Sequence, residues 1–281
     1  MAAVLRKATA QDVDTLADLR AQSFGTDMQE ARSWLRNMAG LDNVLVLERA
    51  GTDGKPGIPA ALLGAVPVEC GHRRGVWFCG MLTRPELRGR GLMSHLLDTC
   101  LRAYAAGGYD FAVTVPESPH AGQALKQLDF KNAFPLRVVR KPIEHNLRAV
   151  AEFDNMTVRR LIDARMRYQP ACITLPETTV TEMVTRLYQK GMTIVSNQRG
   201  YGLFCQQGDV LQVMELQADN DHCADILLQA ARERTGAEYA SILLAENQTL
   251  YLGAGKRCGY GMIRFLSKPF PITDVYFRLL Q

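Results

Sequence analysis

The 281-residue sequence has no apolar run that approaches the roughly 20 residues of a membrane-spanning helix. Its first residues, Met1 to Lys7, contain no apolar core of the kind that a secretion signal has. The seven cysteines are widely spaced and include no C-x-x-C pair, which argues against a zinc site. These absences predict a cytoplasmic protein with reduced thiols, no metal and no membrane partner.

An excess of charge of one sign is also missing. The chain has 33 Lys and Arg against 29 Asp and Glu, and the net charge of +4 is too small and scattered to indicate a nucleic-acid partner. Apolar residues make up 47% and charged residues 22%, which excludes a largely disordered chain. The length favours two domains, and a local basic site for an anionic ligand stays open.

The first half of the chain predicts a mixed α/β (α+β) domain. Apolar alternation predicts strands over 4–9, 43–48, 60–68, 75–83, 111–115 and 131–140, and helical periodicity predicts helices over 13–24, 28–38, 92–104 and 122–128. The order combines an antiparallel meander with a β-α-β crossover, so the helix over 92–104 must lie against the sheet.

The second half repeats part of this order. A helix over 146–167 is expected as a connector, and a hairpin, a helix and two strands follow over 201–216, 223–234, 239–245 and 260–266. The connector carries mixed charges, which indicate a solvated face. A weaker alternative is nucleic-acid contact, and it is opposed by the interleaved acids; the basic residues concerned are Arg159, Arg160, Arg165 and Arg167. We expect two domains, 1–145 and 146–281.

One junction carries chemistry. A strand ends near Thr83, and the run Arg88-Gly89-Arg90-Gly91 stands where the helix over 92–104 begins. Glycines let the backbone turn tightly, and the free N–H groups of a helix start favour a phosphate. A Walker loop and a dinucleotide fingerprint both fit badly, because Leu92-Met93-Ser94 follows the second glycine.

The run Arg88-Gly89-Arg90-Gly91-Leu92 resembles the pyrophosphate loop, Gln/Arg-x-x-Gly-x-Gly/Ala, of the GNAT superfamily of acyl-CoA N-acyltransferases. The order of elements matches as well, over about residues 1–141. The repeated half is similar to the tandem GNAT-like fold of bacterial acetyltransferases of the enhanced-intracellular-survival type, without their additional sterol-carrier-like domain.

The resemblance implies acetyl-CoA as cosubstrate. Its pyrophosphate would lie on the amides of the loop and its pantetheine arm would pair with the preceding strand; the residues implied are Met81, Leu82, Thr83, Arg88, Gly89, Arg90, Gly91, Leu92, Met93 and Ser94. Met93 departs from the motif, because Gly or Ala is usual at its position.

Proton transfer from the amine needs a separate residue. Family members often supply an acid from a Tyr, and Leu125 stands at that position here. Glu117 and His120 follow the strand over 111–115 and are the candidate catalytic residues, because a carboxylate or imidazole can carry a proton near neutral pH. Weaker candidates are Glu69 and the terminal carboxylate of Gln281.

The second half lacks the glycine-rich loop, because Asp219-Asn220-Asp221 stands at the equivalent junction. Such residues cap a helix and would repel a pyrophosphate, so we expect no second CoA site. The sequence predicts an N-acetyltransferase that transfers acetyl directly to a small amine. The alternative is a non-catalytic acyl-CoA-binding or regulatory protein, and a homo-oligomer stays open.

Overall fold

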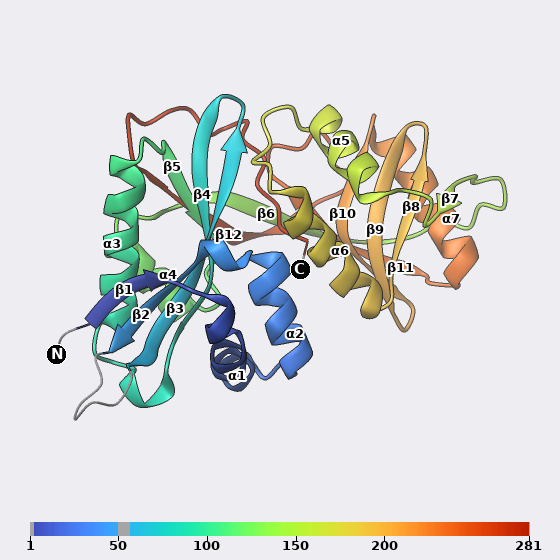
Figure 1. Ribbon diagram of the computed structural model, residues 1–281. Helices are drawn as coiled ribbons and strands as arrows, with labels where there is room; N and C mark the ends of the chain where they lie inside the picture. The colour runs from blue at the N-terminus through green and yellow to red at the C-terminus, as the bar shows by residue number, and fades with distance from the viewer. Residues whose placement is uncertain (1–2, 50–56, 281) are drawn as a thin grey trace. The chain divides into compact units, whose positions relative to one another are not determined.

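The computed structural model describes residues 3–49 and 57–280, and these form two compact units (Figure 1). Unit 1 holds residues up to 131 together with 174–182 and 262–270, and unit 2 holds 132–173, 183–261 and 271–281. The units are therefore discontinuous in sequence, and the expected boundary near residue 145 stays a prediction.

Unit 1 is built on a mixed sheet. An antiparallel meander comes first, and β5 then pairs parallel to β4 and antiparallel to β12. The strands lie in the order β1 (Ala3–Lys7), β2 (Val44–Arg49), β3 (Ile58–Cys70), β4 (Arg73–Thr83), β5 (Phe111–Thr114) and β12 (Gly255–Phe265). The predicted meander and crossover are confirmed.

Helices cover both faces of this sheet. On one face lies α3 (Leu92–Ala106), whose buried residues Leu96, Leu97, Cys100 and Leu101 pack on the apolar side chains of β3 and β4. On the other face, Trp34 reaches Gly64 of β3. It belongs to a π-helical turn, Trp34–Met38, that follows α1 (Val13–Phe24) and α2 (Met28–Ser33). The helix α4 (Pro119–Lys126) follows β5.

Unit 2 repeats this topology. The antiparallel strands β8 (Met192–Asn197), β9 (Gly200–Gln207) and β10 (Val210–Ala218) are followed by α7 (Asp221–Thr235), and β11 (Tyr239–Ala245) pairs parallel to β10. The strands β6 (Lys131–Pro142) and β7 (Glu152–Phe153) pair antiparallel to β11 and β8. The expected partial repeat is therefore present.

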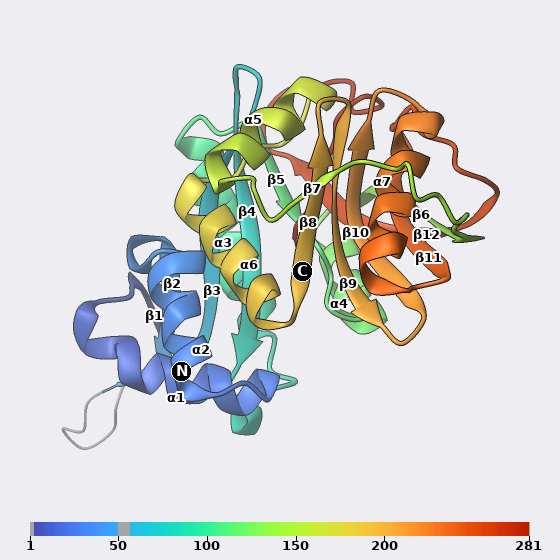
Figure 2. The same cartoon turned by 90° about the vertical axis from the view of Figure 1, so that its right-hand side faces the viewer.

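Two helices flank the sheet of unit 2 (Figure 2). The apolar face of α7 packs on β10 and β11 through Leu227, Val213 and Ile242. On α5 (Val158–Tyr168), Arg165 instead meets Glu215 of β10. The helix α6 (Glu177–Gln189) and the strand β8 were not predicted.

The predicted connector helix over 146–167 is wrong in its first half. Thr157 caps the N-terminus of α5 by accepting from the Arg160 amide, and Asp154 has a positive φ of 54° that a helix does not allow. Ala151 and Phe153 pack against the apolar core of unit 2 instead. The predicted solvated face is also wrong at Arg165, which is 7% exposed.

In the described part of the chain, no helix combines the length and the apolar character that crossing a membrane requires. Nor do residues 3–49 and 57–280 hold a cluster of His, Cys, Asp and Glu that could bind a metal ion. All seven cysteines are free thiols, and five of them are buried.

Candidate functional site

The sheet of unit 1 opens between β4 and β5. The two strands pair in parallel only from Gly75 to Trp77 on β4, opposite Phe111 to Val113. Beyond this point β4 runs on to Thr83, whereas β5 ends at Thr114. The far end of β4 therefore has no strand beside it on this edge among the described residues, and its backbone is available to an extended ligand.

The loop after β4 leads into α3 through two glycines with left-handed backbone. Gly89 has a φ of 74° and Gly91, the N-cap of α3, has a φ of 72°. A Cβ at either position would find no atom within 4 Å, so the loop encloses open space. Glycine is needed here for its conformation, because an L-residue with a side chain is strained at this φ.

The amides of this loop are only partly engaged. The Arg88 amide closes a 3₁₀ turn by donating to Pro85 O at 3.3 Å. In the described structure, the amides of Gly89, Arg90 and Gly91 donate no backbone hydrogen bond. Together with the positive end of the α3 dipole they form what we call the cradle, an arrangement that favours an anion; that it binds a pyrophosphate stays a prediction.

The side chains around the cradle differ in exposure. Arg88, Arg90 and Ser94 are exposed, and Arg88 Nε donates to Thr83 O at 3.2 Å. Leu92 and Met93 are half-buried and pack against the apolar core beneath α3. Met93, the departure from the motif, is therefore held by the core of unit 1.

The predicted strand residues lie at the end of β4. Leu82 pairs with Leu62 and Thr83 with Ala61 of β3, so this end of β4 is anchored on its other edge. A β-bulge precedes them, where Gly80 has a φ of 55° and Met81 is half-buried against the α3 core. The bulge breaks the regular pairing just where β4 and β5 separate.

Glu117 and His120 both follow β5 but differ in setting. Glu117 remains exposed, yet partial desolvation by its surroundings raises the pKa of its carboxyl, and the positive charge of Arg20 opposes this shift. His120 is an exposed residue in the first turn of α4, which Ser118 caps by accepting from the Ala121 amide. Glu117 is thus the candidate with an electrostatic link to its surroundings.

The other weak candidates are placed as follows. Glu69 is exposed near the end of β3, where its backbone pairs with Thr174. Leu125, at the position of the usual tyrosine, is 3% exposed and belongs to the apolar core of unit 1. Gln281 lies outside the described residues.

Sequence reasoning missed a cluster on the α1–α2 side of the bulge. The Arg20 guanidinium lies 4.0 Å from the Trp34 ring and 4.4 Å from the Phe24 ring. A Cβ at Gly80 would come within 2.3 Å of Trp34 Cζ2 and 2.8 Å of Arg20 Nη1. An arginine at a buried position of the α1 stripe was the signal that could have shown it.

Cys79 lies beside this cluster and is not a nucleophile. Burial raises the pKa of its thiol to about 12, and Arg20 lowers this pKa only in part. The thiol therefore stays protonated at neutral pH, where a nucleophile would need to be a thiolate.

The equivalent junction of unit 2 is built differently. Asn220 caps α7 by accepting from the Cys223 amide, and the Asp221 carboxylate accepts from the amides of Tyr251 and Leu252. Two carboxylates and a side-chain cap thus stand where unit 1 has open glycines. This agrees with the reason for which no second CoA site is expected.

The chain was compared with protein families, with curated proteins and with solved structures. Residues 4–124 match the family model described as an acetyltransferase (GNAT) domain. A comparison with curated proteins found no match.

Solved structures resemble the chain over nearly its whole length. A GCN5-related N-acetyltransferase from Anabaena variabilis has 14% identity and a TM-score of 0.74, covering 95% of this chain and 73% of that one. Eis1 from Mycobacterium abscessus has 11% identity and a TM-score of 0.66, with coverages of 94% and 74%. A tandem GNAT protein from the clavulanic acid biosynthesis pathway has 11% identity and a TM-score of 0.52, with coverages of 96% and 99%. The chain therefore has a tandem GNAT-like fold, and its residues 4–124 match the acetyltransferase (GNAT) domain.

Proposed function

We propose that this protein is an N-acetyltransferase that transfers an acetyl group from acetyl-CoA directly to the amine of a small molecule. One observation carries the proposal: the unengaged amides of the glycine loop at the start of α3 adjoin the unpaired end of β4. That combination offers a diphosphate site next to an edge for an extended amide-bearing chain.

The residues of unit 1 would bind the cosubstrate along this line. The amides of Gly89, Arg90 and Gly91 would hold the diphosphate, with Arg88 and Arg90 supplying positive charge. The backbone of Met81, Leu82 and Thr83 would pair with the pantetheine arm. When bound, acetyl-CoA would supply a thioester carbonyl carbon. The amine nitrogen would bond to this carbon as the carbon–sulfur bond breaks, and CoA would leave as a thiolate that takes up a proton.

Glu117 is the group we assign to proton removal. The incoming amine must lose a proton before or during attack, and a carboxylate whose pKa is raised is a better base than an ordinary one. His120 is the second candidate and lies in the first turn of α4, three residues after Glu117 in the sequence. Positioning of the two substrates would supply much of the remaining rate enhancement.

A second function is favoured by one observation. Leu125 occupies the position of the family's usual acid and is buried in the core, so no phenol stands there. A non-catalytic acyl-CoA-binding protein would show the same cradle without turnover. Release of CoA with a panel of amines separates the two: turnover above the hydrolysis background excludes the non-catalytic function, and its absence despite tight binding favours it.

The cradle itself is tested by calorimetric titration with acetyl-CoA. We expect micromolar binding by the wild type and a loss of at least about tenfold in Arg88→Glu, which places a negative charge beside the diphosphate. Arg102→Glu is the matched control, since it makes the same charge change on α3 about 15 Å along the helix from its start. Unchanged affinity in Arg88→Glu would show that the cradle is assigned wrongly.

A further inference from the structure

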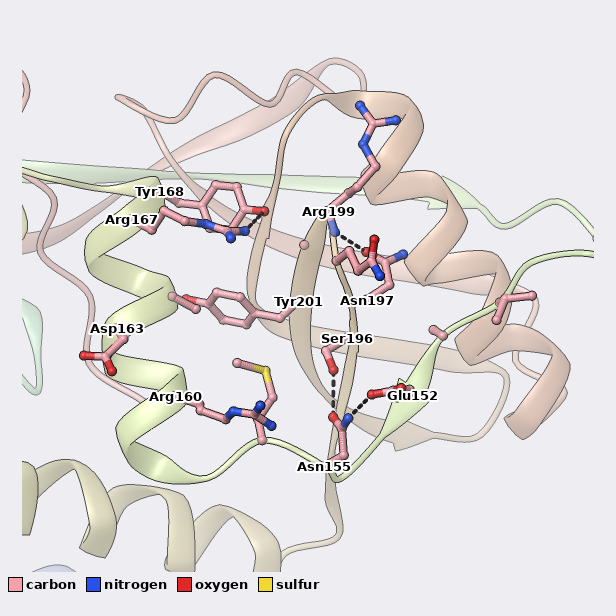
Figure 3. A pocket seen from close by; sticks show the side chains of 16 residues that line it. Glu152, Asn155, Arg160, Asp163, Arg167, Tyr168, Ser196, Asn197, Arg199 and Tyr201 are labelled. Atoms are coloured by element: carbon pink, nitrogen blue, oxygen red, sulfur yellow. Dashed lines mark hydrogen bonds between the residues drawn. The ribbon is translucent and has the colours of Figure 1, made fainter.

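Unit 2 contains a pocket of its own, with a volume of about 790 Å³ (Figure 3). It lies between α5, the segment around β7, and the turn that joins β8 to β9. Its size is in the range of pockets that hold small organic molecules. All of its lining residues belong to unit 2, so it is independent of the site in unit 1.

The base of the pocket is an aromatic ring held in a fixed place. Tyr201 is 1% exposed, and its hydroxyl donates to Glu215 Oε1 at 2.6 Å. The same carboxylate is bound by Arg165, whose Nε donates at 2.9 Å. Tyr168 lies at the side, with its ring centre 6.3 Å from that of Tyr201 and tilted by 56°. The buried Tyr201 thus supports Tyr168, and the half-buried Tyr168 ring is the apolar surface against which a flat group can lie.

Two arginines of α5 supply positive charge to this surface. Arg160 and Arg167 are seven residues apart, which is two helical turns, so both lie on the same face of α5. Figure 3 shows both side chains directed toward the cavity, whereas Asp163 points away from it. Asp163 is itself paired with Arg159 at 3.4 Å.

Neither arginine is neutralised. Among the described residues no carboxylate lies within ion-pair distance of Arg160 or Arg167. Arg167 donates instead to the hydroxyl of Tyr168 at 2.7 Å. Arg199, at the far rim, is already paired with Asp219 at 3.1 Å. Arg160 thus faces the cavity without a carboxylate partner among the described residues. Arg167 reaches a carboxylate only through Tyr168, whose hydroxyl donates to Asp219 at 3.2 Å.

The acidic residue that remains in the pocket is engaged by an amide. The Asn155 side chain donates to the Glu152 carboxylate and accepts from Ser196 Oγ at 2.9 Å (Figure 3). This arrangement fixes Glu152 at the β7 side, opposite α5. The pocket lining therefore has its positive charge on the α5 side, its carboxylate on the β7 side and an apolar base between α5 and β7.

We propose that this pocket binds a small planar organic anion, an aromatic ring that bears a phosphate or carboxylate group. The ring lies against the half-buried Tyr168, and the anionic group accepts from the guanidinium groups of Arg160 and Arg167. Arginine suits this role, because its planar fork binds both phosphate and carboxylate by two hydrogen bonds at once. The second unit thereby has a ligand of its own, distinct from the cosubstrate of unit 1.

The test is a titration of the full chain at fixed ionic strength, followed by ligand-observed NMR, with phenyl phosphate and benzoate as probes. We expect one or both probes to bind with a Kd below about 1 mM and inorganic phosphate to bind at least about tenfold more weakly. The double variant Arg160→Gln/Arg167→Gln should lose at least about tenfold in affinity for the probe that binds. Ala164→Trp should also abolish binding, because it fills the cavity without changing a charge.

The matched control is Arg148→Gln, which removes the same charge from an exposed position of unit 2 outside the pocket. Its affinity should equal that of the wild type, and circular dichroism should show every variant folded. Preference for phosphate over carboxylate, or the reverse, identifies the anionic group. Three results overturn the proposal: no binding of either probe, equal binding of inorganic phosphate, or an equal loss in Arg148→Gln.

Discussion

Replacing Arg165 by methionine removes the cation from a buried ion pair and leaves its carboxylate in place. Arg165 donates to both oxygens of Glu215, and the side chains are only 9% and 0% exposed. Burial opposes the charge on Arg165, but Glu215 raises the pKa of its guanidinium well above the ordinary value. Arg165 therefore stays charged in the folded protein, and the single variant leaves the buried Glu215 side chain without its cation.

The loss of stability in each variant depends on which buried group the variant leaves without a partner. Loss of one partner of a buried pair costs about 3–5 kcal/mol, whereas replacement of both partners by apolar residues is close to neutral. In Arg165→Met/Glu215→Leu the Tyr201 hydroxyl loses its acceptor, which costs about 1–3 kcal/mol. Adding Tyr201→Phe removes that group as well. We expect the single variant to be least stable, the double intermediate and the triple closest to wild type.

The assay must report on unit 2 itself. Both tryptophans, Trp34 and Trp77, lie in unit 1, so fluorescence would follow the wrong unit. Hydrogen exchange measured by mass spectrometry on peptides from α5 and β10 gives the local opening free energy directly. If the single variant lies within about 1 kcal/mol of wild type, or the triple is as unstable as the single, the reasoning about the buried charge fails.

Four further outcomes follow from unit 1. Hydrogen bonding to Arg6 holds the pKa of the Asp12 carboxyl well below its usual range, so the pair stabilises the fold above about pH 4 and loses this effect as the pH falls. Asp12→Asn should therefore cost about 1–2 kcal/mol at pH 7, and this cost should shrink gradually as the pH falls below about 4, measured by urea unfolding. Glu117→Gln should lower kcat by about 10²–10⁴ with acetyl-CoA affinity unchanged, and wild-type kcat/KM should fall at acid pH as the carboxyl is protonated. Gly91→Ala should cost about 1–2 kcal/mol from backbone strain alone, because its Cβ meets no atom within 4 Å. Gly75→Ala places a Cβ 2.3 Å from the Phe111 ring. This overlap should lower the free energy of unfolding by about 1–3 kcal/mol in thermal unfolding, although Gly75, unlike Gly91, does not have a positive φ.

The pattern of apolar residues was sufficient to predict a helix or strand where one face of that element is buried. The α3 stripe and the alternation of β2, β3 and β4 predicted these elements to within a few residues, because burial against one core determines both period and register. The glycines of the cradle were also readable, because a positive φ restricts the residue type at Gly89 and Gly91.

The pattern of apolar residues did not predict the structure where contacts between polar residues determine it. The 146–167 segment has helical composition, yet Thr157 starts the helix and Asp154 has left-handed backbone. Arg165 read as part of a solvated charge run because its partner, Glu215, is 50 residues away in sequence. The same limit hid the Arg20–Trp34 stack and the pocket of unit 2, since each depends on pairs that no local spacing records.

The two units show how one topology can present different sites. Each has a meander, a helix and a parallel strand, but the strand-to-helix junction differs: open glycines in unit 1, and in unit 2 a capping Asn220 with Asp221 bound to backbone amides. A diphosphate at the second junction would have to displace that cap and meet a carboxylate, so binding there is opposed twice. Unit 2 instead has the arginines Arg160 and Arg167 at a pocket on the α5 side of its sheet. If this division is correct, acetyl-CoA should bind with a stoichiometry of one, and Arg160→Gln/Arg167→Gln should leave that binding unchanged. A stoichiometry of two would refute it.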